Sequence, residues 1–352
     1  MSAPLEVTRF ETNQGARIYR FPLNGFPGFM VYAYLVLVDD FVVLIDTGTN
    51  FHTSNQDLDA GLALASEQEG RQIGFTELTH IFISHGHIDH FAGLAYVEPQ
   101  TDALIAVHEL DYRILMNFQE RKVVVYPRLE EFLQESGVSE QRIPEIMEMY
   151  MSSKALFDSS RVDLTYQAEG MRIGPFEFLN VPGHSAGAVV IRLHDVLFTG
   201  DHVLSKITPH MAPERLSLNS GLSHYLESLG KVKAWAGDVN LALAGHEDPI
   251  ADLSGRVEAI AVEHFQRLIK LIGVLDQPGT ISSISKELFG KVHGYNVLLA
   301  LEEAGAHVEY LYKLGFIGID NLQEVEESKE LIPIRYRALR SAAALENVFP
   351  KI

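Results

Sequence analysis

One run of seven residues limits what this chain can fold into more than any other part of the sequence. Residues 84–90 read Ser-His-Gly-His-Ile-Asp-His and continue the predicted apolar strand 81–84. Residues two apart on an extended segment face the same side, so His85 and His87 point into one cavity as the strand ends. A turn into a helix then brings Asp89 and His90 to that cavity, and Gly86 leaves room for the tight backbone.

These side chains suit a borderline divalent metal ion, which binds imidazole nitrogen and carboxylate oxygen. The chain has 352 residues and contains no cysteine. Its sequence therefore excludes a disulfide framework, a thiolate nucleophile, an iron–sulfur cluster and cysteine-ligated zinc. Any metal in this protein must be held by histidine and by carboxylates.

Three more ligand candidates each follow a predicted strand. His184, Asp201 and His246 come directly after the strands expected at 176–181, 196–199 and 241–244, and each stands next to a glycine. A neighbouring glycine suits a loop that presents a ligand at the edge of a sheet. With the run 84–90, the candidates amount to five histidines and two aspartates.

The remaining sequence predicts a large domain that mixes strands and helices, followed by a small helical domain. We expect a first domain at 1–252, with a helical insertion at 109–153 that either packs in the core or forms one wall of the substrate pocket. The second domain is expected at 253–352. Further strands are predicted at 17–21, 31–38, 41–45, 104–107, 162–166 and 188–193, and helices at 56–69, 91–97, 223–236, 257–275, 282–289 and 296–314.

In these residues the sequence resembles the metallo-β-lactamase superfamily of metallohydrolases. The resemblance covers roughly residues 15–250 and includes Asp46 in the run Leu-Ile-Asp-Thr-Gly at 44–48. The runs 198–209 and 263–317 resemble the subgroup with a C-terminal winged-helix-like domain. The resemblance implies an α/β fold: an αββα sandwich with a small, mostly helical, winged-helix-like C-terminal domain.

The resemblance also implies two divalent metal ions per chain, zinc in the first place and iron or manganese as alternatives. It assigns His85, His87 and His184 to one ion. It assigns Asp89, His90 and His246 to the other, with Asp201 bridging both. Asp46 would accept a hydrogen bond from a ligand histidine and so fix its orientation. His202 follows Asp201 and is a candidate for a similar supporting role or for a substrate contact, with an ordinary core residue as the alternative.

The leading functional hypothesis is a dinuclear metal-dependent hydrolase, in which a bridging hydroxide attacks a small ester, thioester or lactone. Asp89 is the candidate catalytic residue, because it could accept a proton from the nucleophile. One alternative is a metal-dependent phosphodiesterase or nuclease that acts on single-stranded RNA or DNA. A second alternative is a ligand-binding or regulatory module without turnover.

Charge speaks against the nucleic-acid alternative without excluding it. The chain has 28 basic and 47 acidic residues, a net charge of −19. Residues 255–352 hold 11 basic and 13 acidic residues, so the acid excess lies on the first domain. Affinity for nucleic acid comes largely from lysine and arginine that neutralise phosphates.

A serine-hydrolase hypothesis rests on the run Gly-His-Ser-Ala-Gly at 183–187, which matches the Gly-x-Ser-x-Gly pattern. That nucleophile elbow requires a strand, a turn and a helix. The β-branched run 188–193 predicts a strand after the turn, which disfavours Ser185 as a nucleophile.

The sequence shows no signal peptide at 1–10 and no apolar stretch near the 18 or more residues of a spanning helix. We therefore expect a cytoplasmic protein whose partner is a small-molecule substrate. We expect no membrane as a partner; nucleic acid is disfavoured without being excluded, and a homo-oligomer is left open.

Overall fold

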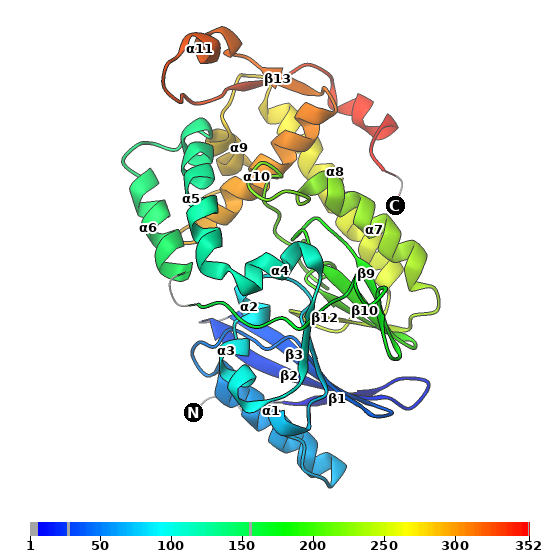
Figure 1. Ribbon diagram of the computed structural model, residues 1–352. Coiled ribbons are helices and arrows are strands. Elements are labelled where there is room, and N and C mark those ends of the chain that lie inside the picture. Colours follow the sequence, from blue (N-terminus) through cyan, green and yellow to red (C-terminus); the bar gives the residue numbers. More distant parts are fainter. Residues whose placement is uncertain (1–5, 27–28, 155–156, 351) are drawn as a thin grey trace. The chain divides into compact units, whose positions relative to one another are not determined.

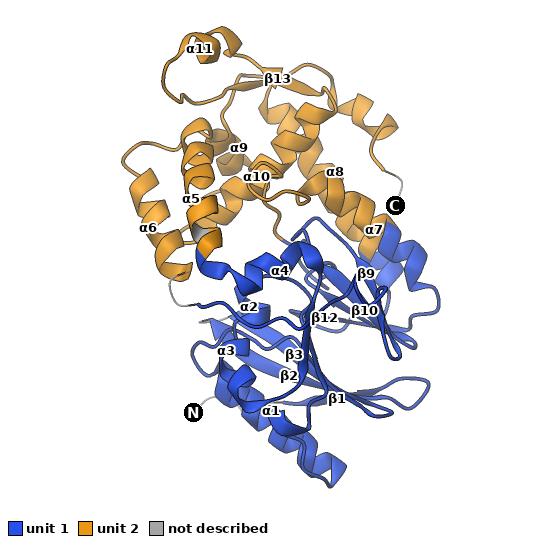
Figure 2. Ribbon diagram, in the orientation of Figure 1, with its two compact units in different colours: residues 1–119, 157–209, 231–256 blue, residues 120–156, 210–230, 257–352 orange. Residues whose placement is uncertain are grey.

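The computed structural model describes residues 6–26, 29–154, 157–350 and 352 (Figure 1). The chain forms two compact units, each built from three separate segments (Figure 2). Unit 1 comprises residues 1–119, 157–209 and 231–256, and unit 2 comprises 120–156, 210–230 and 257–352. Most of the segment predicted as an insertion, 120–153, therefore shares a unit with the C-terminal helices.

The first sheet of unit 1 has seven strands that lie in chain order. The first four strands pair antiparallel, and Asp39 in the turn between β3 and β4 has a φ of +49°. From β4 onward the strands pair parallel, so their carboxyl ends meet at one edge. The strands are β1 (Thr8–Glu11), β2 (Arg17–Phe26), β3 (Phe29–Val38), β4 (Phe41–Ile45), β5 (His80–Phe82), β6 (Leu104–Val107) and β7 (Leu164–Thr165).

The second sheet of unit 1 has five strands in the order β12-β11-β10-β9-β8. A buried apolar cluster lies between the two sheets, in which Phe82 of the first sheet meets Phe176 of the second with ring centroids 5.1 Å apart. The amide of Tyr32 donates to the carbonyl of Gly245 at 2.8 Å, which ties β3 to the end of β12. The strands are β8 (Arg172–Ile173), β9 (Phe176–Asn180), β10 (Val189–Leu193), β11 (Val196–Gly200) and β12 (Leu241–Ala244).

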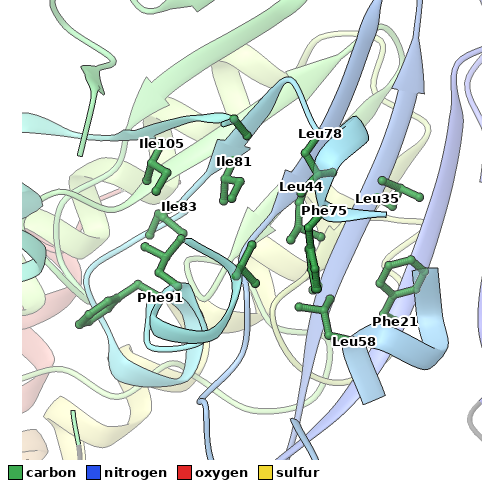
Figure 3. Packing of buried hydrophobic residues seen from close by; sticks show 14 of the residues in the cluster. Phe21, Leu35, Leu44, Leu58, Phe75, Leu78, Ile81, Ile83, Phe91 and Ile105 are labelled. Atoms are coloured by element: carbon green, nitrogen blue, oxygen red, sulfur yellow. The ribbon is translucent and has the colours of Figure 1, made fainter. Parts of the chain in front are cut away.

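Helices cover the other face of the first sheet, where a second apolar cluster forms (Figure 3). Alternate residues of β3 enter different clusters, Leu35 this one and Val36 the cluster between the sheets, as the strand period of two requires. The two packed sheets with covering helices confirm the mixed α/β fold expected from the sequence. The covering elements are α1 (Ser54–Glu69), η1 (Phe75–Glu77), α2 (Ile88–Phe91), α3 (Leu94–Val97) and η2 (Glu98–Gln100).

The single helix predicted at 91–97 is two short helices in the structure, and Gly93 explains the break. A Cβ built on Gly93 would lie 2.0 Å from the carbonyl oxygen of Thr47. The amide of Gly93 donates to the carbonyl of Gly48 at 2.9 Å instead of continuing a helical ladder. The close backbone approach therefore ends α2 directly after its histidine.

The helical stretch predicted at 109–153 is three helices, α4 (Glu109–Met116), α5 (Phe118–Glu135) and α6 (Ile143–Lys154). The later helices are α7 (Leu222–Ala236), α8 (Leu253–Val274), α9 (Ile281–Phe289), α10 (Asn296–Lys313) and α11 (Leu322–Glu327). The helix predicted at 223–236 begins one residue earlier, at Leu222. None of the helices among the described residues is long and apolar enough to cross a membrane.

Unit 2 ends in a small antiparallel pair, β13 (Ile317–Ile319) with β14 (Tyr336–Ala338), followed by η3 (Ala342–Asn347). Gly279, between α8 and α9, also pairs with Tyr336 of β14. Helix α11 lies in the connection between β13 and β14.

Candidate metal centre

The seven predicted ligand residues lie where strands of both sheets end in unit 1. His85 and His87 follow β5, and Asp89 and His90 lie on the short helix α2 that begins immediately after them. The other three residues come directly after β9, β11 and β12, and are His184, Asp201 and His246. Because the backbone turns from β5 into α2 at this point, the side chains of His85 and His87 come together with those of Asp89 and His90.

The structure gathers these residues into two groups, and within each group one ligand atom per residue lies within 4.8 Å of all the others. The first group is His85, His87 and His184. The second group is Asp89, His90, Asp201 and His246. Nitrogen and oxygen ligands at this spacing suit borderline divalent ions such as zinc.

Asp201 lies between the two groups. Its Oδ2 atom is 3.2 Å from Nε2 of His246 in the second group and 3.6 Å from Nε2 of His184 in the first. Its Oδ1 atom is 3.4 Å from Nε2 of His90. One carboxylate thus faces nitrogen atoms of both groups.

Hydrogen bonds outside the groups fix which ring nitrogen three of the histidines present. Nδ1 of His90 donates to Asp46 at 2.8 Å, and Nδ1 of His246 donates to the carbonyl of Met30 at 2.7 Å. Nδ1 of His85 contacts the hydroxyl of Ser84 at 3.0 Å. With Nδ1 engaged in this way, Nε2 of each ring turns toward the cluster, as outer partners of metal ligands do.

Several buried polar atoms of the second group lack a well-directed hydrogen bond. They are Nε2 of His90, Nε2 of His246 and Oδ1 of Asp201. Buried polar groups without partners are costly, and a cation among them would satisfy nitrogen and oxygen lone pairs together. The donor set therefore fits a divalent metal ion.

The pKa values of the cluster histidines also indicate a site for a cation. Burial alone would lower the pKa of His246, but the carboxylates of Asp201 and Asp89 outweigh it and raise that pKa to about 10. Burial likewise opposes a proton on His90, yet Asp201, Asp89 and Asp46 raise its pKa well above the usual value. The facing carboxylates thus create a strong preference for positive charge, which either protons or a metal ion can supply.

Asp46, predicted as a supporting residue, is buried directly after β4. It accepts hydrogen bonds from the amide of Ser84 at 2.8 Å, from the Ser84 hydroxyl at 2.7 Å and from Nδ1 of His90. Its φ of +60° lies in the left-handed region that residues other than glycine rarely adopt. His202 is buried beside Asp201, but in the described part of the chain it belongs to neither group.

Asp111 is a buried residue of the site that the sequence patterns did not single out. It lies in the first turn of α4, just after β6, and accepts a hydrogen bond from Ser185. Ser185 itself lies between two strands, β9 and β10, and not in the strand–turn–helix setting of a nucleophile elbow. The position of Asp111 directly beyond a parallel strand, at the edge that carries Asp46 and His85, was the available signal.

A third group of possible ligands, His264, Glu303 and His307, lies in unit 2. The carboxylate of Glu303 accepts from the Arg267 guanidinium at 2.9 Å and from the amide of Met211 at 2.8 Å. Nδ1 of His307 donates to the carbonyl of Glu303 at 2.7 Å. Since a guanidinium already neutralises the carboxylate, this group is a buried hydrogen-bond network and its chemistry does not suit a metal ion.

A family profile described as the metallo-β-lactamase superfamily matches residues 26–246, which span both groups of ligand candidates. The chain belongs to the metallo-β-lactamase superfamily. This fold family is generally hydrolytic, and the chain is an enzyme of this fold. No curated protein matches the sequence.

Two solved structures illustrate the similarity within the superfamily. A metallo-β-lactamase family protein from Thermus thermophilus is 25% identical, with a TM-score of 0.72 over 91% of this chain and 98% of that chain. A β-lactamase domain protein from Burkholderia ambifaria is 20% identical, with a TM-score of 0.71 over 94% of each chain. Both likenesses extend beyond the residues that the family profile matches.

Proposed function

We propose that this protein is a dinuclear metal-dependent hydrolase of small esters, thioesters or lactones. The observation that carries the proposal is the pair of adjacent His/Asp groups, with Asp201 facing nitrogen atoms of both. Two sites that share one carboxylate are the arrangement that a pair of divalent ions needs.

In this proposal each group holds one ion, and zinc is the first candidate because all ligands are imidazole or carboxylate. His85, His87 and His184 hold the first ion; Asp89, His90 and His246 hold the second, and Asp201 serves both. Metal ions bound there would polarise the substrate carbonyl and make a water molecule nucleophilic at neutral pH.

Asp89 is the residue we propose to move a proton. Its side chain is 15% exposed, whereas those of His90 and Asp201 are 0% and 9% exposed. Asp89 is therefore the more accessible of the two carboxylates of its group, which suits a residue that exchanges a proton with a reacting water or a departing alcohol or thiol.

We also infer a winged-helix-like arrangement for residues 257–338. Three helices, α8, α9 and α10, are followed by the hairpin β13–β14. Gly279, between α8 and α9, adds to the other side of β14 by pairing with Tyr336. This order of helices and strand pairs supports the subgroup suggested by the sequence.

The burial of α10 favours a small substrate over nucleic acid. In a helix-turn-helix arrangement the last helix reads the groove, so its outer face must be accessible. Of the 18 residues in α10, 11 are buried, and Gly305 packs closely against Phe132 and Pro213. Three glutamates, Glu302, Glu303 and Glu309, also lie on this helix, where phosphate contacts would require cations.

Metal removal and replacement test the proposed activity. We expect a chelator to abolish hydrolysis of ester, thioester or lactone substrates, and zinc, iron(II) or manganese to restore it. Full activity after complete removal of metal would contradict the proposal. Cleavage of single-stranded oligonucleotides, with no hydrolysis in the small-substrate panel, would establish the alternative instead.

His87→Ala tests the ligand assignment. His87 is only half-buried, so we expect the variant to fold, to lose one metal ion per chain and to lose most of its activity. Elemental analysis, with circular dichroism as the check on folding, measures this. Two metal ions with wild-type turnover would remove His87 from the centre.

A further inference from the structure

A single buried carboxylate joins two loops of the candidate centre. The Oδ2 atom of Asp111 accepts from the amide of Gly86 at 2.7 Å and from the hydroxyl of Ser185 at 3.1 Å. Its Oδ1 atom accepts from the amide of Gly187 at 2.9 Å. Asp111 is fully buried, so water does not weaken these charge-assisted hydrogen bonds.

The two loops are the ones that carry the first histidine group. Gly86 stands between His85 and His87 on the loop after β5, and Ser185 follows His184 on the loop between β9 and β10. These loops belong to different sheets. The distance from His85 and His87 to His184 therefore depends on the contacts that join the two loops.

The close approach of Asp111 requires a glycine at position 187 and leaves little room for a side chain at position 86. A Cβ on Gly187 would lie 2.5 Å from Cγ of Asp111, and a Cβ on Gly86 would lie 3.2 Å from it. Neither glycine has a positive φ, so neither is required by its backbone conformation. The sequence thus keeps both positions without side chains at the point where the carboxylate reaches the backbone.

The second group has separate supports. His90 is oriented by Asp46, and His246 by the carbonyl of Met30. Its remaining carboxylates lie on α2 and after β11. A change at Asp111 is therefore expected to act on the first group.

We propose that Asp111 is a positioning residue, which sets the separation of His85 and His87 from His184 and so determines how tightly the first metal ion binds. Ser185 has the same role through its hydroxyl, in place of the nucleophile role that its sequence pattern suggests. This inference rests on the proposed metal centre.

Asp111→Asn tests it. The amide keeps one acceptor oxygen, and in either orientation its NH₂ group faces a backbone N–H, that of Gly86 or that of Gly187, so at least one of these two hydrogen bonds between Asp111 and the loops is lost. We expect zinc affinity of the first site to fall about 10- to 100-fold, as for other partners that orient ligands, and affinity of the second to stay unchanged. A stepwise zinc titration measures both affinities. Anomalous scattering from crystals with one zinc per chain should locate the ion in the second group.

Asp195→Asn is the matched control. Asp195 lies in the turn before β11, at the opposite end of that strand from Asp201, and accepts from the amide of Asn13 at 2.8 Å and from the Asn240 side chain at 3.3 Å. A merely structural role for Asp111 predicts that both variants lose stability and that neither changes zinc affinity. A selective loss at one site in Asp111→Asn alone supports positioning.

Ser185→Ala removes one hydrogen bond only and provides a second variant if Asp111→Asn does not fold. We expect its first-site affinity to fall about tenfold. Wild-type affinities at both sites in Ser185→Ala, and in Asp111→Asn if it folds, would overturn the positioning role and leave the metal centre standing. A wild-type chain that binds no zinc would instead overturn the proposed function itself.

Discussion

At the scale of single residues, the site depends on atoms that hold the ligands as much as on the ligands themselves. His90, His246 and His85 each have Nδ1 engaged by a different partner: a carboxylate, a backbone carbonyl and a hydroxyl. The seven ligand candidates could be predicted because each follows a predicted strand, often beside a glycine. The role of the Met30 carbonyl could not be predicted, because every residue has a backbone carbonyl and the residue type does not show which one accepts a hydrogen bond.

Asp46→Asn tests the orientation of His90. Asparagine tolerates the left-handed backbone at this position, so the variant changes charge and hydrogen bonding and leaves the fold intact. We expect metal affinity and hydrolysis to fall about 10- to 100-fold. Asp39→Asn is the control, because Asp39 has a similar φ in an exposed turn; equal losses in both variants would contradict the assignment.

At the scale of elements, the sequence predicted the C-terminal ends of α1, α7, α9 and α10 to within one residue, but it did not predict the breaks within 91–97 and 109–153. Strands β3 and β4 and the turn between them follow from apolar runs around Asp39. The helical character of 109–153 does not show where one helix ends and the next begins. In the structure α5 ends before Gly137, whose φ of +76° matches a common helix terminator. The break at Gly93 had no such signal, since it comes from a contact with Thr47 across the fold.

Gly93→Ala tests that break. The new methyl group would meet the Thr47 backbone, which cannot move aside as a flexible side chain can. We expect the free energy of unfolding to fall by about 1–3 kcal/mol. Gly230→Ala, inside α7 with open space around it, should instead stabilise the protein by about 0.5–1 kcal/mol. Urea unfolding measures both, and equal effects would refute the contact.

At the scale of the whole molecule, long-range contacts decide which segments share a unit. Residues 210–230 join unit 2, where Met211 and Glu214 donate backbone hydrogen bonds to Glu303 and Glu309 of α10. No local pattern announces such contacts, so the sequence predicted a single boundary near residue 252. The sequence did predict the helices of residues 257–314 and the acid excess of the chain.

Acid should destabilise unit 2 through its buried histidine pair. Burial, and then the charges of His307 and Arg267, hold the pKa of His264 well below its usual value, and burial also lowers the pKa of His307. Their neighbours are Arg267, Glu303 and the ring of Tyr225. The unfolded chain binds protons at these two histidines more readily than the folded chain does. The stability that depends on both rings being neutral is therefore fully present above about pH 6.5 and is lost as the pH falls below that value.

The measurement is the free energy of urea unfolding at about pH 8 and about pH 5.5. We expect the wild type to lose more stability between these values than His264→Asn, which cannot take up that proton. Subtracting the loss in the variant from the loss in the wild type cancels the contributions of other titratable groups, including those of the metal centre. Identical losses would show that His264 does not contribute.

Metal should stabilise one unit selectively, because all seven candidate ligands lie in unit 1. With free zinc at 100 times its dissociation constant, binding contributes about 2.7 kcal/mol per site. Hydrogen exchange should slow on zinc addition in the loops around residues 84–90, 182–187 and 245–247. Helices α8 and α10 serve as the internal reference, and slowing there of the same size would contradict the prediction.

The backbone hydrogen bond between Tyr32 and Gly245 has a consequence for how the chain folds during its synthesis. β3 is synthesised early, whereas β12, which precedes His246, leaves the ribosome more than 200 residues later. Contacts so distant in sequence form late and slowly. A nascent chain therefore contains His85 and His87, which follow β5, long before it can close the cluster. In the proposed dinuclear centre, capture of the second metal ion would mark the moment at which unit 1 has finished folding.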